Sequence, residues 1–304
     1  APVSSATDEQ ASIQVSNLSV AQHAIVATYD GDGSFQGSNG SVAQKVERAH
    51  TSTLVTSSAN PAKSGQAVTF TANVSPVAPG AGDPQGTVTF TINGAQLGNA
   101  VMLSGGQAPS SAFATLSPGT YQVKATYSGD GHFVGSAGGF DQGAGLDVVK
   151  AATTMTLDSS ANPSDFGAPV TFTSTVAAVA PATGRPSGVV QFWEGGKLLG
   201  ASNLAAAAAN TSVATFVTST LAPGPHAIRA VYVGNFNFEG QTSTTSQDVG
   251  QATTVTGISS TPESSTFGDD VTFTSTVTGA AGAPGSPSGS VTFREGSTVL
   301  GVAS

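Results

Sequence analysis

The sequence predicts an all-β protein built from tandem β-sandwiches, and three observations carry this prediction. Short segments alternate apolar and polar residues, similar segments recur about every 100 residues, and turn residues separate them. The 304 residues include 38 Gly and 16 Pro, which fall between the alternating segments. Strands with one buried face, joined by turns of this kind, are typical of packed sheets. No segment has a sustained helical period.

The repeat is clearest in one strand motif that occurs three times. The motif reads VTFTANV at 68–74 and VTFTSTV at both 170–176 and 271–277, so its Phe residues lie 102 and 101 residues apart. A period of this length is too long for a solenoid unit and fits one small sandwich. Two further motifs recur in the same order: GTVTF (86–90), GVVQF (188–192) and GSVTF (289–293); HAIVATYDGDGSF (23–35), YQVKATYSGDGHF (121–133) and HAIRAVYVGNFNF (226–238).

The alternation within these motifs predicts which side chains are buried. In the motif at 68–74 one face carries only apolar side chains and the other face is polar, so the apolar face should pack against a second sheet. The motif at 121–127 has the same pattern, and its copies keep the register. The residues expected to face inward are Val68, Phe70, Ala72 and Val74 in the first motif, and Tyr121, Val123, Ala125 and Tyr127 in the second.

The composition limits the classes of function. Nine Lys and Arg stand against 18 Asp and Glu, and the formal net charge of −9 argues against a nucleic-acid surface. There is no Cys, which removes disulfides, thiolate nucleophiles and thiolate metal sites. No stretch has the roughly 18 consecutive apolar residues of a membrane span. We therefore expect no nucleic-acid partner, no membrane insertion, no cofactor and no metal.

Three stretches carry a family resemblance: SSANPSDFGAPVTFTSTV (159–176), PSGVVQFWEGGKLLG (186–200) and LAPGPHAIRAVYVGNFNFEGQTS (221–243). They resemble bacterial Ig-like repeat domains of the Big type, and the resemblance extends over essentially the whole chain. It implies seven-stranded Greek-key sandwiches that occur in tandem in large secreted or surface-anchored proteins, where such a domain is mostly a spacer or presenter. It therefore implies an extracellular or cell-surface location and says little about a ligand.

On this reading the strands of one repeat can be placed. Strands A, B, E and D should form one sheet, and strands C, F and G the other. The alanine-rich segment 203–212 should be a loop or an edge. The expected strands in the first complete repeat are 52–57 (A), 68–74 (B), 87–91 (C), 96–101 (C′/D), 111–115 (E), 121–127 (F) and 144–150 (G).

The repeat also predicts the domain organisation. Residues 51–150 and 151–252 hold complete Ig-like domains, whereas 1–50 match only strands E to G and 253–304 only strands A to C′/D. Strand E of the first segment is expected at 12–17. Linkers between repeats are nearly absent, which favours a stiff rod.

The two partial repeats are complementary in sequence. Ala1 aligns with Leu204 and Ser304 with Asn203, so the tail of one chain and the head of another would reconstitute one repeat. Half a sandwich buries too little apolar surface to be stable alone. The leading hypothesis is therefore a filament subunit that binds identical subunits head-to-tail. Its expected interface residues are Ile13, Val15, Ile25, Ala27, Tyr29, Val271, Phe273, Val277, Val291, Phe293 and Leu300.

Two other functions compete with this hypothesis. The chain can be a window cut from a giant surface adhesin, in which peptide bonds join the partial repeats to their neighbours. A glycan-binding module is the third alternative, and it rests on Trp193, the only Trp, together with exposed aromatic side chains. An unidentified surface or glycan ligand thus stays open as a partner. Enzyme activity is not expected, because no Ser–His–Asp or His–carboxylate set recurs.

Several polar residues have a structural interpretation. Asp30 and Asp32 resemble the start of a calcium loop, but the copies of this segment favour a shared turn. His23 and His226 occupy the position of Tyr121, an aromatic slot at a strand edge. Trp193 should point outward. The remaining acidic residues considered, Glu194, Asp269 and Asp270, are predicted to be solvated charges.

Overall fold

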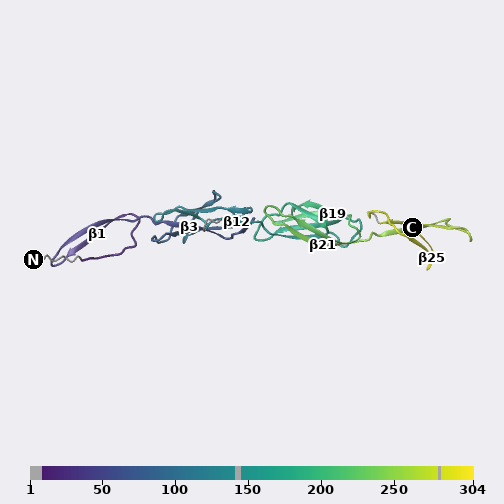
Figure 1. The fold of residues 1–304 in the computed structure, drawn as a ribbon, viewed down its shortest axis with the longest axis horizontal. Coiled ribbons are helices and arrows are strands. Elements are labelled where there is room, and N and C mark those ends of the chain that lie inside the picture. Colours follow the sequence, from purple (N-terminus) through teal and green to yellow (C-terminus); the bar gives the residue numbers. More distant parts are fainter. Residues whose placement is uncertain (1–8, 141–144, 280–281) are drawn as a thin grey trace. The chain divides into compact units, whose positions relative to one another are not determined.

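The computed structural model describes residues 9–140, 145–279 and 282–304, and every regular element in them is a β-strand (Figure 1). The expectations placed on Ala1 and on Ala144, the start of the predicted strand 144–150, lie outside the described residues. Contacts divide the chain into two units near Val148 and Val149, and each unit is described by itself.

The first unit contains a two-stranded sheet, β1–β2, followed by most of a sandwich over residues 51–149. The segments Lys63–Gln66 and Thr115–Pro118 and the residue Val149 of this sandwich are grouped with the second unit. The sheets of this first sandwich have the orders β3-β5-β8, β11-β10-β6-β7 and β4-β12-β9. The strands are β1 (Gln22–Gly31), β2 (Gln36–Lys45), β3 (Thr51–Ser57), β4 (Ala62–Lys63), β5 (Phe70–Pro76), β6 (Thr87–Ile92), β7 (Ala95–Met102), β8 (Gln107–Pro109), β9 (Gly119–Tyr121), β10 (Val123–Tyr127), β11 (Ser136–Gly139) and β12 (Leu146–Val149).

The second unit contains a sandwich over residues 153–250 and two hairpins. The sheets of this second sandwich have the orders β13-β15-β19-β18 and β14-β21-β20-β16-β17, while β22–β23 and β24–β25 form two-stranded sheets. The strands are β13 (Thr153–Ser159), β14 (Ser164–Asp165), β15 (Val170–Ala178), β16 (Val189–Glu194), β17 (Lys197–Asn203), β18 (Ala205–Ala206), β19 (Thr211–Thr218), β20 (Gly224–Tyr232), β21 (Gln241–Gly250), β22 (Thr254–Thr261), β23 (Thr272–Gly279), β24 (Val291–Glu295) and β25 (Thr298–Ala303).

The alternating motifs form the cores of the two sandwiches. In the first sandwich the side chains predicted to face inward are buried, with the exception of the half-buried Tyr121. In the second sandwich Phe172 on β15 and Phe192 on β16 are fully buried, and Phe192 stacks on Phe216 with the ring centroids 5.3 Å apart. The buried face was thus correctly predicted from the period of two.

One ladder joins the early and late strands of each sandwich. Strand β16 pairs antiparallel with β20, and Val190 lies opposite Tyr232. Strand β6 pairs with β10 in the same way, and Val88 lies opposite Tyr127. These are the predicted strands C and F. A second ladder, β15 with β19, joins strands B and E in the second sandwich.

Two predicted strands E are wrong. Residues 12–17 form no strand, because strand E is held by pairing to strand B and no described residue pairs with this segment. In the first sandwich the pairing to β5 runs through β8, and the predicted segment 111–115 keeps only an isolated bridge from Phe113 to Val68.

The predicted strand F of the first sandwich is interrupted at Gln122. The Gln122 backbone N–H donates to Asn93 Oδ1 at 2.8 Å instead of to a neighbouring strand, so the strand divides into β9 and β10. The segment 203–212 is an edge as predicted, since it contains the two-residue strand β18 and the turn that follows it.

We expect Phe172→Ala to lower the free energy of unfolding of the second sandwich by about 3–5 kcal/mol, because it removes a fully buried aromatic ring and leaves a cavity. Val217→Ala on the neighbouring strand β19 is the matched control, since Val217 is 57% exposed. Denaturant titration checks both variants. An equal loss in the two variants would contradict the assigned core.

Candidate protein–protein interface

Two terminal segments lack the cover that the sandwiches have. The N-terminal segment, residues 9–47, contains the hairpin β1–β2. The C-terminal segment, residues 254–304, contains the hairpins β22–β23 and β24–β25. The internal repeat gives each residue in these segments an equivalent in a sandwich of the same chain, so its exposure can be compared with that of a matched residue.

The N-terminal segment exposes side chains that are buried in the sandwiches. Tyr29 is 46% exposed, whereas its equivalents Tyr127 and Tyr232 are 2% and 1% exposed. Phe35 is 69% exposed, against 5% for both of its equivalents. Ile25 follows the same pattern, and Ala27 is also exposed. The strand alternation is intact, but the apolar face stays exposed among the described residues.

The C-terminal segment shows the same contrast. Phe273 is 47% exposed, while its equivalents Phe70 and Phe172 are fully buried. Ile258 is 67% exposed, against 6% for its equivalent Leu157. Leu300 is exposed as well. The remaining predicted interface residues of this segment are half-buried: Val271, Val277, Val291 and Phe293.

Each terminal segment has grooves along this apolar face. In the N-terminal segment a groove of about 960 Å³ brings Ile13 and Val15 beside Ile25 and Val42. Ile13 and Val15 are 85% and 58% exposed. Ala27 and Tyr29, which the sequence predicted to belong to the same interface, do not line this groove.

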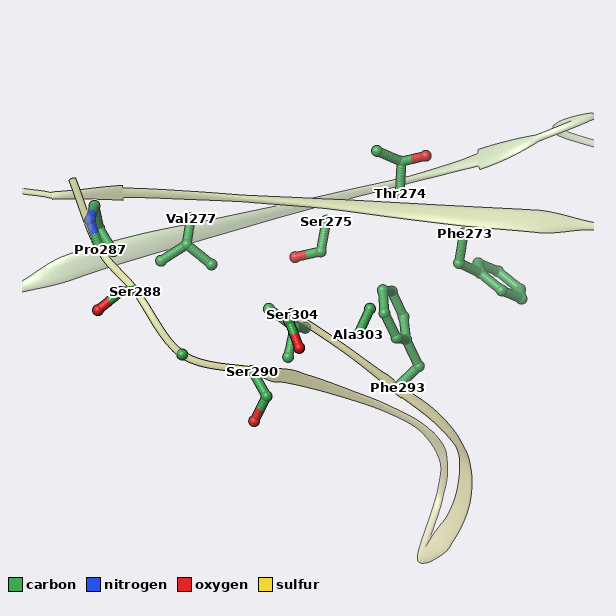
Figure 2. A pocket seen from close by; sticks show the side chains of 12 residues that line it. Phe273, Thr274, Ser275, Val277, Pro287, Ser288, Ser290, Phe293, Ala303 and Ser304 are labelled. Atoms are coloured by element: carbon green, nitrogen blue, oxygen red, sulfur yellow. The ribbon is translucent and has the colours of Figure 1, made fainter.

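Two grooves lie between the hairpins of the C-terminal segment, with volumes of about 460 and 420 Å³. In the first, Phe273, Ser275 and Val277 of β23 point toward the β24–β25 hairpin, and Thr274 points away (Figure 2). Phe293 approaches the same space from β24. Phe273 and Phe293 line both grooves, so these two rings are the centre of the exposed face.

Strand edges are open in a matching way. Among the strands that the structure describes, β1 pairs only with β2, whereas its equivalents β10 and β20 also pair with a strand C. In the same described part of the chain, β24 pairs only with β25, whereas β16 also pairs with strand F. Among the described residues, the N-terminal segment thus has a strand F without strand C, and the C-terminal segment has a strand C without strand F.

Asp32 lies in the turn between β1 and β2, and Asp30 precedes this turn near the end of β1. Asp32 Oδ1 accepts the backbone N–H groups of Ser34 and Phe35 at 2.7 and 2.8 Å, and these hydrogen bonds lower the pKa of Asp32. Asp130 and Asn235 close the equivalent turns with the same pattern of acceptance. The shared geometry confirms the predicted turn. The described residues contain no cluster of three or more His, Asp or Glu arranged to hold a metal ion.

Glu194 is not the solvated charge that the sequence predicted. Its Oε1 pairs with Nδ1 of His226, and His226 Nε2 lies 2.6 Å from the carbonyl oxygen of Ala222. Burial by itself would lower the pKa of His226, but the Glu194 carboxylate and the Ala222 carbonyl outweigh it and raise the pKa above its usual 6.5. The pair was missed because its members lie 32 residues apart and meet only through the pairing of β16 with β20.

Trp193 is half-buried on strand β16, at a register shift of the ladder to β17. The guanidinium of Arg229 lies 5.9 Å from the centre of its ring. One face of the indole is therefore occupied by a side chain of the same sheet. Glycan binding at Trp193 stays an untested prediction.

These features define the class of the protein as a tandem array of Ig-like β-sandwiches. The family model for the bacterial Ig-like domain (group 3) matches residues 55–140 and 156–250, which is more than half of the chain. The chain belongs to this family, and the resemblance inferred from its motifs is confirmed. The search of curated proteins gave no match.

Three solved structures with related folds share little sequence identity with this chain. Fibronectin(III)-like modules of Clostridium thermocellum CbhA share 15% identity over 65% of this chain and 95% of that chain, with a TM-score of 0.24. A titin fragment has 17% sequence identity over 76% of this chain and 77% of the titin chain, with a TM-score of 0.38. The Escherichia coli adhesin FdeC has 12% identity over 76% of this chain and 74% of the FdeC chain, with a TM-score of 0.29. The assignment therefore rests on the family model. No helix capable of crossing a membrane occurs in the described residues.

The His226–Glu194 pair predicts a pH dependence of stability for the second sandwich. Because the folded-state pKa of His226 is raised, its contribution is fully present below pH 6.5 and is lost as the pH rises through the folded-state pKa. We expect Glu194→Gln to remove this dependence. Urea titrations from pH 5 to 9 on the wild type and the variant check it, and parallel curves for the two proteins would contradict it.

Proposed function

We propose that this protein is an extracellular structural subunit that polymerises head-to-tail, with the C-terminal segment of one copy completed by the N-terminal segment of the next. The observation that carries the proposal is the reciprocity of the open edges. Among the described residues, the N-terminal segment has a strand F, which is β1, but no strand C beside it. The C-terminal segment has a strand C, which is β24, but no strand F beside it. An unpaired strand edge is a template for a strand of another chain.

The second pair of strands supports the same arrangement. Within residues 9–140, 145–279 and 282–304, strand β23, the equivalent of strand B, pairs only with β22, while β15 also pairs with strand E. Residues 12–17 are the sequence equivalent of part of strand E and have no described strand partner. One contact between two copies would therefore complete both layers of a sandwich.

Side chains at the rim have matching partners as well. In the second sandwich the hydroxyl group of Tyr232 donates to the Ser187 carbonyl at 2.9 Å. The equivalents of these residues are Tyr29 and Ser288, and they lie on opposite terminal segments. Docking of the two segments would give the exposed Tyr29 ring both an apolar cover and this acceptor.

The binding free energy would come mainly from burial of the two apolar faces and from main-chain ladders, so neither a catalyst nor a cofactor is required. The contact joins different surfaces of two copies, which is the heterologous type that extends into filaments or closes into rings. Bacterial Ig-like membership supports an extracellular or surface role for such an array.

The same two segments would also fit an array in which peptide bonds connect successive repeats, as in a long surface adhesin. The mass of the native protein separates the two cases. A native chain of 29.7 kDa supports the subunit, and a much larger continuous chain supports the adhesin spacer.

We expect the 304-residue chain to form polymers and Phe273→Asp to abolish them, because a charge would be buried at the centre of the exposed face. Light scattering coupled to size exclusion measures the assembly. The matched control is Val217→Asp, which places the same charge on an exposed position of a complete sandwich and should leave polymers intact.

Two outcomes would contradict the proposal. The first is a wild-type chain that stays monomeric at high concentration. The second is a Phe273→Asp chain that assembles as well as the Val217→Asp control, because the exposed face would then play no part in assembly.

A further inference from the structure

The ladder between strands C and F sets a register that can be carried to the two terminal segments. In the second sandwich Val190 lies opposite Tyr232, Phe192 opposite Ala230 and Glu194 opposite Ile228. The repeat offsets convert these pairs to Val291 with Tyr29, Phe293 with Ala27 and Glu295 with Ile25. Two of these pairs, Val291 with Tyr29 and Phe293 with Ala27, join apolar residues, and a shift by one residue would turn one face of the strand outward.

Two positions at the end of this ladder, which lie diagonally and not opposite each other, change their chemistry between repeats. In the first sandwich the two positions hold Tyr121 and Ile92, both apolar and half-buried. In the second sandwich they hold the ion pair of His226 with Glu194. The two positions therefore change together, as expected for residues that contact each other.

The terminal segments contain the same residue types as the ion pair of the second sandwich, with the His in the N-terminal segment and the Glu in the C-terminal segment. His23 is the equivalent of His226, and Glu295 is the equivalent of Glu194. His23 already has the local contact of His226, because its Nε2 lies 2.8 Å from the carbonyl oxygen of Ser19, four residues earlier. This contact leaves Nδ1 as the ring atom for a partner. Within the described residues, Glu295 makes no ion pair.

We infer that strand β24 of one copy pairs antiparallel with β1 of the next in the register Val291 to Tyr29, and that Glu295 binds His23 across this junction. The inference rests on the proposed function and makes it more specific. It names the two strands, their register and one polar contact that selects that register. A shift by two residues would keep the apolar face inward but separate His23 from Glu295, so the contact discriminates against that slip.

The charges around this contact differ from those in the second sandwich. Lys45 of β2, which pairs with Glu47 at 2.5 Å, takes the position of Asp248. Arg294 precedes Glu295 on β24, where the second sandwich has Trp193. The Glu295 carboxylate therefore approaches a surface that carries His23 and Lys45, and this favours it over an apolar residue at the same position.

Disulfide trapping tests the register. The chain has no Cys, so any crosslink comes from the introduced pair. Thr28→Cys with Thr292→Cys joins positions that are directly opposite in the inferred register, where Cα atoms lie about 4.5–5.5 Å apart. We expect a ladder of covalent oligomers on non-reducing gels. Val26→Cys with Thr292→Cys is the matched control, displaced by two residues, and should crosslink at least 10-fold less.

A double-mutant cycle tests the polar contact. We expect His23→Gln and Glu295→Gln each to weaken assembly about 10-fold or more, because a hydrogen bond to a charged group is lost. The double variant should be no weaker than the weaker single variant. His132→Gln is the control, since His132 lies in a turn of the first sandwich and should leave assembly unchanged.

The outcomes separate this inference from the proposed function. Polymers that crosslink better through the displaced pair, or single variants whose effects simply multiply, overturn the register and the contact but leave polymerisation standing. A crosslink confined to single chains overturns the contact between copies. A wild-type chain that stays monomeric overturns both the inference and the proposed function.

Discussion

The pairing of strand C with strand F is the interaction on which the rest of the structure depends. In both sandwiches this ladder pairs residues that lie 31 or more positions apart, since Ile92 pairs with Val123 and Glu194 with Ile228. It brings an inward-facing Val opposite an inward-facing Tyr: Val88 with Tyr127, and Val190 with Tyr232. The ladder thus closes one sheet and positions a buried aromatic ring at the same time. Where it is missing, as at β1 and β24, the same residue types are exposed.

Because the sequence repeats, the exposure of a residue in a terminal segment can be compared with that of its equivalents in the two complete sandwiches. The strands at 68–74, 170–176 and 271–277 have nearly the same sequence, yet Phe70 and Phe172 are fully buried and Phe273 is 47% exposed. Local sequence cannot account for that difference. The exposed face of the C-terminal segment therefore results from a lack of covering strands, and not from a change in the strand itself.

The sequence was sufficient to predict the sandwich class, the buried face of the motifs in the two sandwiches and the turn closed by Asp32, because these depend on patterns within a few residues. The repeat was visible directly as recurring motifs. It was not sufficient for the strand predicted at 12–17, which needs a partner strand before it can form a ladder. The interruption at Gln122 depends on the side chain of Asn93, 29 residues away. The predicted interface residues are exposed or half-buried, although Ala27 and Tyr29 lie away from the groove at Ile13.

The ion pair of Glu194 with His226 was missed for a related reason. Each residue alone has the pattern of a surface position at the end of a strand, and only the C–F register brings the two together. Once that register is known, the residue types at the equivalent positions of the terminal segments can be interpreted. The presence of His at position 23 and Glu at position 295 then becomes a specific hypothesis about how two copies meet.

Amide hydrogen exchange across a range of protein concentrations tests the central claim most directly. If the terminal segments complete each other, protection in β1, β23 and β24 should rise together with concentration and approach that of β20, β15 and β16. The strands of the two complete sandwiches should be unaffected and serve as the internal reference. Protection in the terminal strands that stays low at every concentration would contradict the account.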